Sequence, residues 1–173
     1  MMSTPIRTGR RAFTLVEILI VVIIIGLLAG IVLSQFRDPA DQARAASLQV
    51  KLKEIRKQLQ LYEVDHQGAL PASSEGDSAD TFLDQMTSYT DVDGNTRDYS
   101  DENRYKYGPY IDSLPANPVS GLRDVRIVTN MRTQFRARNQ DGGWWYNAVT
   151  GEFRADLTDD RLAPDGETPL NEL

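Results

Sequence analysis

The feature that most constrains this chain is a run of apolar residues close to its N-terminus. From Ile18 to Phe36, 19 consecutive residues carry no charge, and glycine interrupts the run only at Gly26 and Gly30. A helix rises about 1.5 Å per residue, so a run of this length extends for about 30 Å, the thickness of the hydrocarbon core of a bilayer. The run therefore predicts a membrane-spanning helix.

An acidic residue, Glu17, stands immediately before this uncharged run and follows the apolar residues Leu15 and Val16. A carboxylate at such a position is costly in lipid unless it has a partner, and a simple membrane anchor has no use for it. One interpretation is that Glu17 pairs with a positive group of another molecule. The other is that Glu17 lies in the headgroup region, where an acid near a helix N-terminus is favourable to the helix dipole.

Charge is distributed unevenly along the chain. Three basic residues, Arg7, Arg10 and Arg11, precede the apolar run, whereas 24 acidic and 16 basic residues follow Phe36. Basic residues remain on the cytoplasmic side of a membrane, so the acidic part is expected to be exported. An acidic surface argues against nucleic-acid binding, which needs a basic patch. The chain has no cysteine, so no disulfide can brace the exported part.

Leucine and aromatic residues indicate a second, amphipathic helix after the apolar run. They recur at steps of four and three residues, which places them on one face of a helix that should pack on a globular domain: Leu48, Leu52, Ile55, Leu59 and Tyr62. Pro39 lacks a backbone donor, so we expect a kink or short break near residues 37–41. His66, near the expected helix end, is interpreted as a cap or surface residue.

The remaining elements are short. Phe82, Leu83, Met86 and Tyr89 indicate a small amphipathic helix, and Asp93-Gly94 indicates a turn. Residues 144–146 and 152–154 should form a β-hairpin whose turn contains Gly151, within a small antiparallel sheet that also includes residues 125–128. Trp144 and Tyr146 should share one face of the hairpin with Trp145 on the other, and at least one of these faces should pack on the helix, although a platform for a sugar or a partner is an alternative. Residues 157–173 are expected to be a loosely attached acidic tail.

The residues around the start of the apolar run resemble a known processing site. Ala12-Phe13-Thr14-Leu15-Val16-Glu17, followed by the apolar run, is similar to the site cut in type IV prepilins and type II secretion pseudopilins. The resemblance implies cleavage between Ala12 and Phe13 by a prepilin peptidase and methylation of the new amine, although the family usually has glycine where this chain has Ala12. It also implies assembly: Glu17 would pair with the Phe13 amine of a neighbouring subunit offset by about one helical turn.

Two later segments extend the resemblance to the major pseudopilins of type II secretion. Residues 63–71 match the position where those proteins leave their long helix, and residues 107–118 resemble their link from helix to sheet. The expected fold is therefore α+β and pilin-like: a long N-terminal helix, half transmembrane and half amphipathic, packed on a small C-terminal antiparallel sheet. Residues 1–12 would be a cleaved leader, 13–36 the transmembrane and assembly helix, and 37–173 a periplasmic domain with an acidic tail.

The expected function is a structural one. The resemblance implies a subunit of a type II secretion pseudopilus, anchored by a single pass in the bacterial inner membrane, whose periplasmic filament supports protein export. Its partners would be further copies of itself, minor pseudopilins, the prepilin peptidase and the inner-membrane assembly platform. Two alternatives stay open: a type IV pilus subunit serving adhesion, motility or DNA uptake, and a membrane-tethered binding module. The sequence shows no catalytic motif, so we expect no enzyme activity.

Calcium is the one ligand that the resemblance suggests, because major pseudopilins bind it through acidic and carbonyl oxygens in a loop near the C-terminal sheet. Two acidic runs are candidates: Asp91, Asp93 and Asn95, and Asp156, Asp159 and Asp160. Neither has the glycine placement and distal glutamate of an EF-hand. These runs are therefore either calcium ligands or solvated acidic loops.

Overall fold

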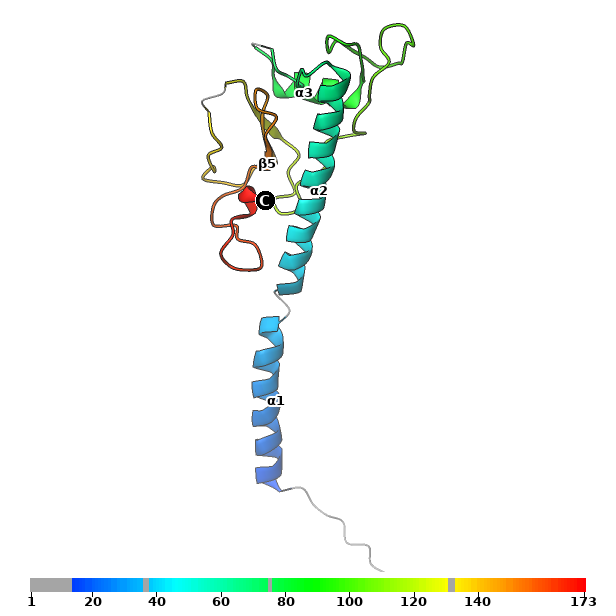
Figure 1. Cartoon of the computed structure of the whole chain (residues 1–173). Coiled ribbons are helices and arrows are strands. Elements are labelled where there is room, and N and C mark those ends of the chain that lie inside the picture. The colour runs from blue at the N-terminus through cyan, green and yellow to red at the C-terminus, as the bar shows by residue number, and fades with distance from the viewer. Residues whose placement is uncertain (1–13, 36–37, 75, 131–132) are drawn as a thin grey trace, which may run out of the picture. The chain divides into compact units, whose positions relative to one another are not determined.

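The computed structural model of the chain describes residues 14–35, 38–74, 76–130 and 133–173. Within these ranges, side chains are described for all residues except those from 29 to 38. It divides into two units, residues 1–40 and 41–173, each of which is described by itself. The predicted processing site, Ala12 and Phe13, lies outside the described residues. Figure 1 shows the helices and strands, coloured along the chain.

The first unit contains the helix α1, Leu15–Gln35. The large apolar side chains from Leu15 to Leu28 each have about half of their surface or more exposed, with Leu15 at 82% and Leu28 at 55%. Among the described residues, no helix combines the length and the apolar character that a membrane span requires. The membrane span expected over residues 13–36 stays a prediction.

The second unit is organised around α2, Asp38–Asp65 (Figure 1). Pro39 lies in its first turn, where the missing N–H has no intrahelical partner to lose. The amphipathic stripe is confirmed: Leu48, Leu52, Ile55, Leu59 and Tyr62 are all buried, each with at most 3% of its surface exposed. Together with Ala45 they form the helical side of the core. The 3.6-residue period therefore predicted the buried face of this helix correctly.

A small helix and a hairpin follow α2. The helix α3, Ala79–Thr87, begins with a capping box formed by Ser78 and Thr81 and buries Phe82 and Met86. Strands β1, Tyr89–Thr90, and β2, Thr96–Arg97, pair antiparallel across a turn in which Gly94 N–H donates to the Asp91 carbonyl at 3.0 Å. Both the amphipathic helix and the turn at Asp93-Gly94 are thus confirmed.

The C-terminal sheet has three strands in the order β3, Val125–Val128, then β4, Trp144–Asn147, then β5, Phe153–Ala155. The predicted hairpin is confirmed: β4 and β5 pair antiparallel, with Trp145 opposite Arg154 and Tyr146 opposite Phe153. The sheet as a whole is mixed, because β3 runs parallel to β4. The prediction of a purely antiparallel sheet was therefore wrong for the pairing of β3 with β4. The connection over residues 129–143 is long enough to return the chain to the end at which β3 began.

The sheet packs its β4 residues into the core. Trp144 and Tyr146 join the same hydrophobic cluster as the α2 stripe, and the Tyr146 ring lies 4.8 Å from that of Phe82. Trp145 points to the other face and is nevertheless 0% exposed. With both tryptophans and Tyr146 buried, these rings offer no open platform for a sugar, and the packing interpretation is confirmed.

Two sequence-based expectations about the second unit need correction. The surface alternative for His66 was wrong, although its ring does bond a carbonyl in the last turn of α2, and the loose tail was wrong. His66 is buried: its ring stacks on Tyr62 at 3.7 Å, Nδ1–H donates to the Tyr62 carbonyl at 2.8 Å, and Nε2 lies 3.0 Å from the Thr90 hydroxyl. The C-terminal tail is docked rather than loose. Leu157 and Leu170 are buried, and the short 3₁₀ helix η1, Leu170–Glu172, lies against the unit beside β5 (Figure 1).

Candidate functional site

The N-terminus of α1 carries the first candidate site. Thr14 precedes the helix, its backbone N–H and its hydroxyl both donate to Glu17 Oε2 at 3.2 Å, and Glu17 N–H donates back to the Thr14 hydroxyl at 3.2 Å. This reciprocal arrangement is a capping box, which satisfies two donors that the helix itself leaves free. Glu17 therefore has the helix-terminal geometry that the second interpretation of this residue predicted.

The capping box leaves part of the Glu17 carboxylate available. Both bonds from Thr14 go to Oε2, and Oε1 accepts no hydrogen bond from any residue that the structure describes. The residue is exposed, and so are the apolar side chains that follow it along α1. Pairing of Glu17 with a Phe13 amine stays a prediction, because Phe13 lies outside the described residues. The capping box leaves Oε1 open to such a partner, so the two interactions are compatible.

The first acidic run, around Asp91, is organised by hydrogen bonds within the chain. Asp91 Oδ1 accepts from the backbone N–H groups of Asp93 and Asn95 at 3.1 and 2.9 Å, and Oδ2 pairs with Arg104 Nε at 2.9 Å. The Asn95 amide also donates to both oxygens. Burial raises the pKa of Asp91, but the bonds from Asn95, Arg104 and Asp93 together outweigh it and hold that pKa below its usual value.

The second acidic run does not converge on one centre. The Asp156 side chain is fully buried and forms ion pairs with Arg126 and Arg138. Asp159 accepts from the Asn171 amide at 2.9 Å, and Asp160 is exposed. Within the described ranges, no three acidic or histidine side chains gather as a metal site would require. The oxygens of Asp91 and Asp156 are thus committed to donors within the chain, and neither run gathers the ligands that calcium needs among the described residues.

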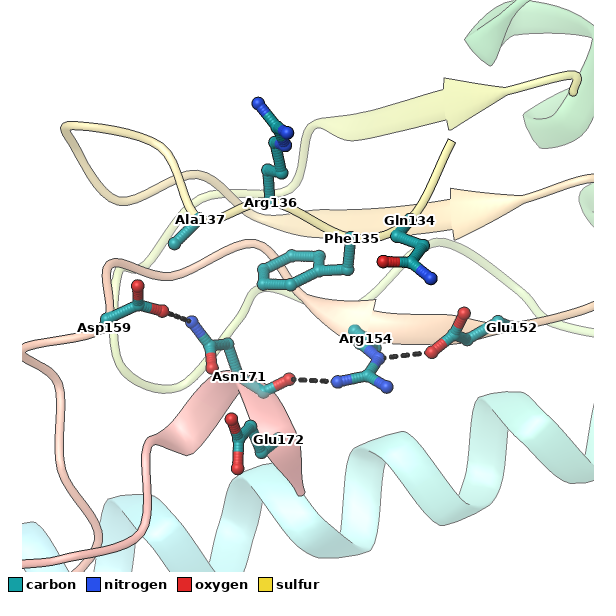
Figure 2. A pocket seen from close by; sticks show the side chains of 9 residues that line it. All are labelled: Gln134, Phe135, Arg136, Ala137, Glu152, Arg154, Asp159, Asn171 and Glu172. Carbon is teal, nitrogen blue, oxygen red and sulfur yellow. Dashed lines mark hydrogen bonds and ion pairs between the residues drawn. The ribbon is translucent and has the colours of Figure 1, made fainter. Parts of the chain in front are cut away.

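A pocket of about 650 Å³ lies between the β3–β4 connection and η1 (Figure 2). Arg154 lies at its centre and bonds to Glu152 and to the Asn171 carbonyl, while Phe135 presents its ring beside them. The Arg154 guanidinium is 5.7 Å from the centre of that ring. Arg154 and Glu152 form an ion pair here, and the described lining residues include no nucleophile beside a base. The pocket is therefore described as a gap between the β3–β4 connection and η1.

Sequence reasoning missed three residues that the structure makes important. Thr14 was noted only as part of the processing motif, although its spacing from Glu17 is that of a capping box and this spacing is readable from sequence. No sequence pattern marks Arg126 and Arg138 in a comparable way. They meet Asp156 only through the parallel pairing of β3 and β4, which was not predicted.

Comparison with known proteins gives three findings. Residues 7–33 match the model of the prokaryotic N-terminal methylation motif. The chain is 36% identical to the "Type II secretion system core protein G" of Pseudomonas aeruginosa over 70 residues, 40% of this chain and 49% of that protein. It is 26% identical to the Klebsiella michiganensis protein of the same name over 123 residues, 71% of this chain and 76% of that protein.

The extent of these matches differs along the chain. The match to the Pseudomonas protein spans about half of that protein's length. The match to the methylation motif begins at Arg7 within the leader and covers Ala12, Phe13, Glu17 and most of the apolar run. No solved structure gives a significant match.

Proposed function

We propose that this chain, which matches the N-terminal methylation motif and is similar to two type II secretion core G proteins, is a structural subunit of a type II secretion pseudopilus. The subunit polymerises through its N-terminal helix, and the resulting periplasmic filament supports the export of proteins. The helix also anchors the free subunit in the bacterial inner membrane by a single pass. The observation that carries the proposal is the placement of Glu17 at the start of α1.

Glu17 supports the proposal because it is the one acid in a helix whose other described side chains, from Leu15 to Leu28, are uncharged and largely exposed. Such a helix needs an apolar environment, either lipid or the helices of other copies. In either environment the carboxylate requires a compensating charge. The methylated Phe13 amine of the next subunit supplies it when neighbouring helices are offset by about one turn.

Processing must precede assembly in this scheme. A prepilin peptidase cuts between Ala12 and Phe13, which removes Arg7, Arg10 and Arg11 and creates the amine that Glu17 needs. The inner-membrane assembly platform and minor pseudopilins are the further partners that the proposal requires. No catalytic step is assigned to the chain itself. The globular unit instead forms the acidic surface of the filament.

The test is the substitution Glu17→Val, with Glu63→Val as the matched control. Glu63 is an exposed acid on α2, so its loss changes the net charge equally without touching α1. We expect Glu17→Val to be cleaved and membrane-bound but to give far less sheared filament than the parent chain. Mass spectrometry should show that the mature chain of both variants begins at Phe13. Normal filament yield from Glu17→Val would refute the pairing, and an intact leader would refute the processing step.

A further inference from the structure

A buried carboxylate with two arginine partners lies at the end of the C-terminal sheet. Asp156 follows β5 and is 0% exposed. Arg126, on β3, donates from Nη2 to Oδ1 at 2.6 Å and from Nε to Oδ2 at 3.1 Å, which is a bidentate contact. Arg138, on the β3–β4 connection, lies 2.9 Å from Oδ2 through its Nε. We call these three residues the arginine clamp.

The clamp holds the β3–β4 connection against the outer face of the sheet. Besides Asp156, the Arg126 guanidinium binds the Arg136 carbonyl at 2.9 Å. Next to Arg136, the Phe135 ring meets the Trp145 ring edge-on with centres 5.5 Å apart. This contact helps to explain why Trp145 is fully buried although it points away from the main core. Release of the clamp should therefore uncover Trp145.

The charges of the clamp are balanced without an added ion. Arg138 also approaches the Asp124 carboxylate at 3.8 Å, so two guanidiniums face two carboxylates. A calcium ion needs six to eight oxygens at 2.3 to 2.6 Å. Here the Asp156 oxygens already accept from guanidinium N–H groups, and two positive charges surround them. Among the described residues of the connection, 129–130 and 133–143, the one acid is Asp141, which is paired with Arg161 at 2.7 Å.

We propose that Arg126 and Arg138 supply, from within the chain, the positive charge that the family resemblance assigns to bound calcium near this sheet. The clamp fixes the β3–β4 connection over Trp145, so the folded unit requires no divalent cation there. This inference does not depend on filament assembly, because every group in it belongs to one copy of the second unit.

The test compares Arg126→Gln and Arg138→Gln with Arg123→Gln in the full chain in detergent. Arg123 is an exposed arginine just before β3, so its loss matches the charge change. Removing one partner of a buried ion pair is strongly destabilising, so we expect each clamp variant to melt roughly 5 °C or more below the parent. Acrylamide should quench tryptophan fluorescence more in the clamp variants well below their melting temperature. Arg123→Gln should match the parent in both measurements.

Calcium provides the decisive comparison, and it uses the parent chain, so a clamp variant that fails to fold does not block it. We expect superimposable melting curves in millimolar calcium chloride and in chelator. A site filled at 100 times its dissociation constant would instead raise the melting temperature by several degrees. Such a rise, or clamp variants whose melting and quenching equal those of Arg123→Gln, would overturn the proposal.

Discussion

Thr14 shows how much one residue can contribute at the start of α1. Its hydroxyl accepts from Glu17 N–H, and both its hydroxyl and its amide donate to Glu17 Oε2. The box thereby holds the carboxylate over its own helix terminus, where it also favours the helix dipole. The three-residue spacing of Thr14 and Glu17 thus stabilises the first turn of α1. It also orients the Glu17 carboxylate, on which the proposed assembly depends.

Thr14→Ala should loosen the first turn of α1. Loss of an N-cap oxygen costs about 1 kcal/mol, which corresponds to an approximately fivefold increase in local opening. Amide hydrogen exchange of the full chain in detergent should show this increase at Glu17 and Ile18, whose amides donate to Thr14. Thr14→Ser keeps a hydroxyl and should exchange like the parent. Equal exchange in Thr14→Ala and the parent would mean that the capping box does not stabilise the turn.

Asp91 should make the second unit sensitive to acid. Its pKa is lowered in the folded state, since hydrogen bonds outweigh the opposing effect of burial. A lowered pKa stabilises the fold above the unfolded value of about 3.9, and this contribution is lost as pH falls toward the folded value. The free energy of unfolding in urea should therefore fall less between pH 7 and pH 3 in Asp91→Asn than in the parent. The exposed neighbour Asp93 is the control, and Asp93→Asn should retain the parent's pH dependence.

At the scale of elements, α2 provides most of the helical contribution to the core. Leu52 is 1% exposed on its buried face, whereas Leu61 is 48% exposed on the same helix. Leu52→Ala removes packed methyl groups and should lower the free energy of unfolding by about 2–5 kcal/mol. Leu61→Ala deletes the same atoms from the surface and should change it by less than about 0.5 kcal/mol. Similar losses in both variants would contradict the assignment of the buried face.

Elements with a strong local pattern were predictable, and those fixed by distant contacts were not. The α2 stripe follows from a period of 3.6 residues, and the hairpin at Trp145 follows from aromatic strands around Gly151. The parallel pairing of β3 with β4 depends on where a 15-residue connection brings the chain, which no local pattern encodes. His66 was misjudged for the same reason: its burial depends on Thr90 and aromatic rings from later in the chain.

The candidate site residues also fall into two groups: those that a local sequence pattern indicates, and those whose partners come from distant parts of the chain. Glu17 is conspicuous in the sequence because it stands alone beside an apolar run, and Thr14 is three residues away from it. The acidic runs were equally conspicuous, but composition cannot reveal that arginines distant in sequence occupy their oxygens. Arg104 binds Asp91, and Arg126 lies 30 residues from Asp156 in the chain. At Asp91 and Asp156, arginine therefore stands where counting acids suggested a cation, and calcium binding itself stays a prediction.

At the scale of the second unit, the C-terminus closes the fold by returning to α2. Arg56, on α2, donates to the Phe153 carbonyl at 3.0 and 2.9 Å and to the Leu173 carbonyl at 2.9 Å. The Asn171 amide is buried and donates to the Leu157 carbonyl at 3.0 Å. A polar, proline-containing tail is thus fixed by backbone contacts and a few apolar residues, although its composition alone indicates a loose segment.

Leu170 and Leu162 allow a direct test of this closure. Leu170 is 6% exposed and belongs to the hydrophobic core, whereas Leu162, in the same tail, is 43% exposed. If the tail is part of the folded unit, Leu170→Ala should lower its free energy of unfolding by about 2–3 kcal/mol, because a buried leucine is truncated. Leu162→Ala should have little effect. Urea unfolding of the two variants under identical conditions measures the difference, and equal stability would mean that the tail does not contribute to the fold. Leu170 and Ile55 belong to the same hydrophobic core although they are 115 residues apart in sequence. A single cooperative transition with a large loss of stability in Leu170→Ala would therefore show that the tail and α2 unfold together.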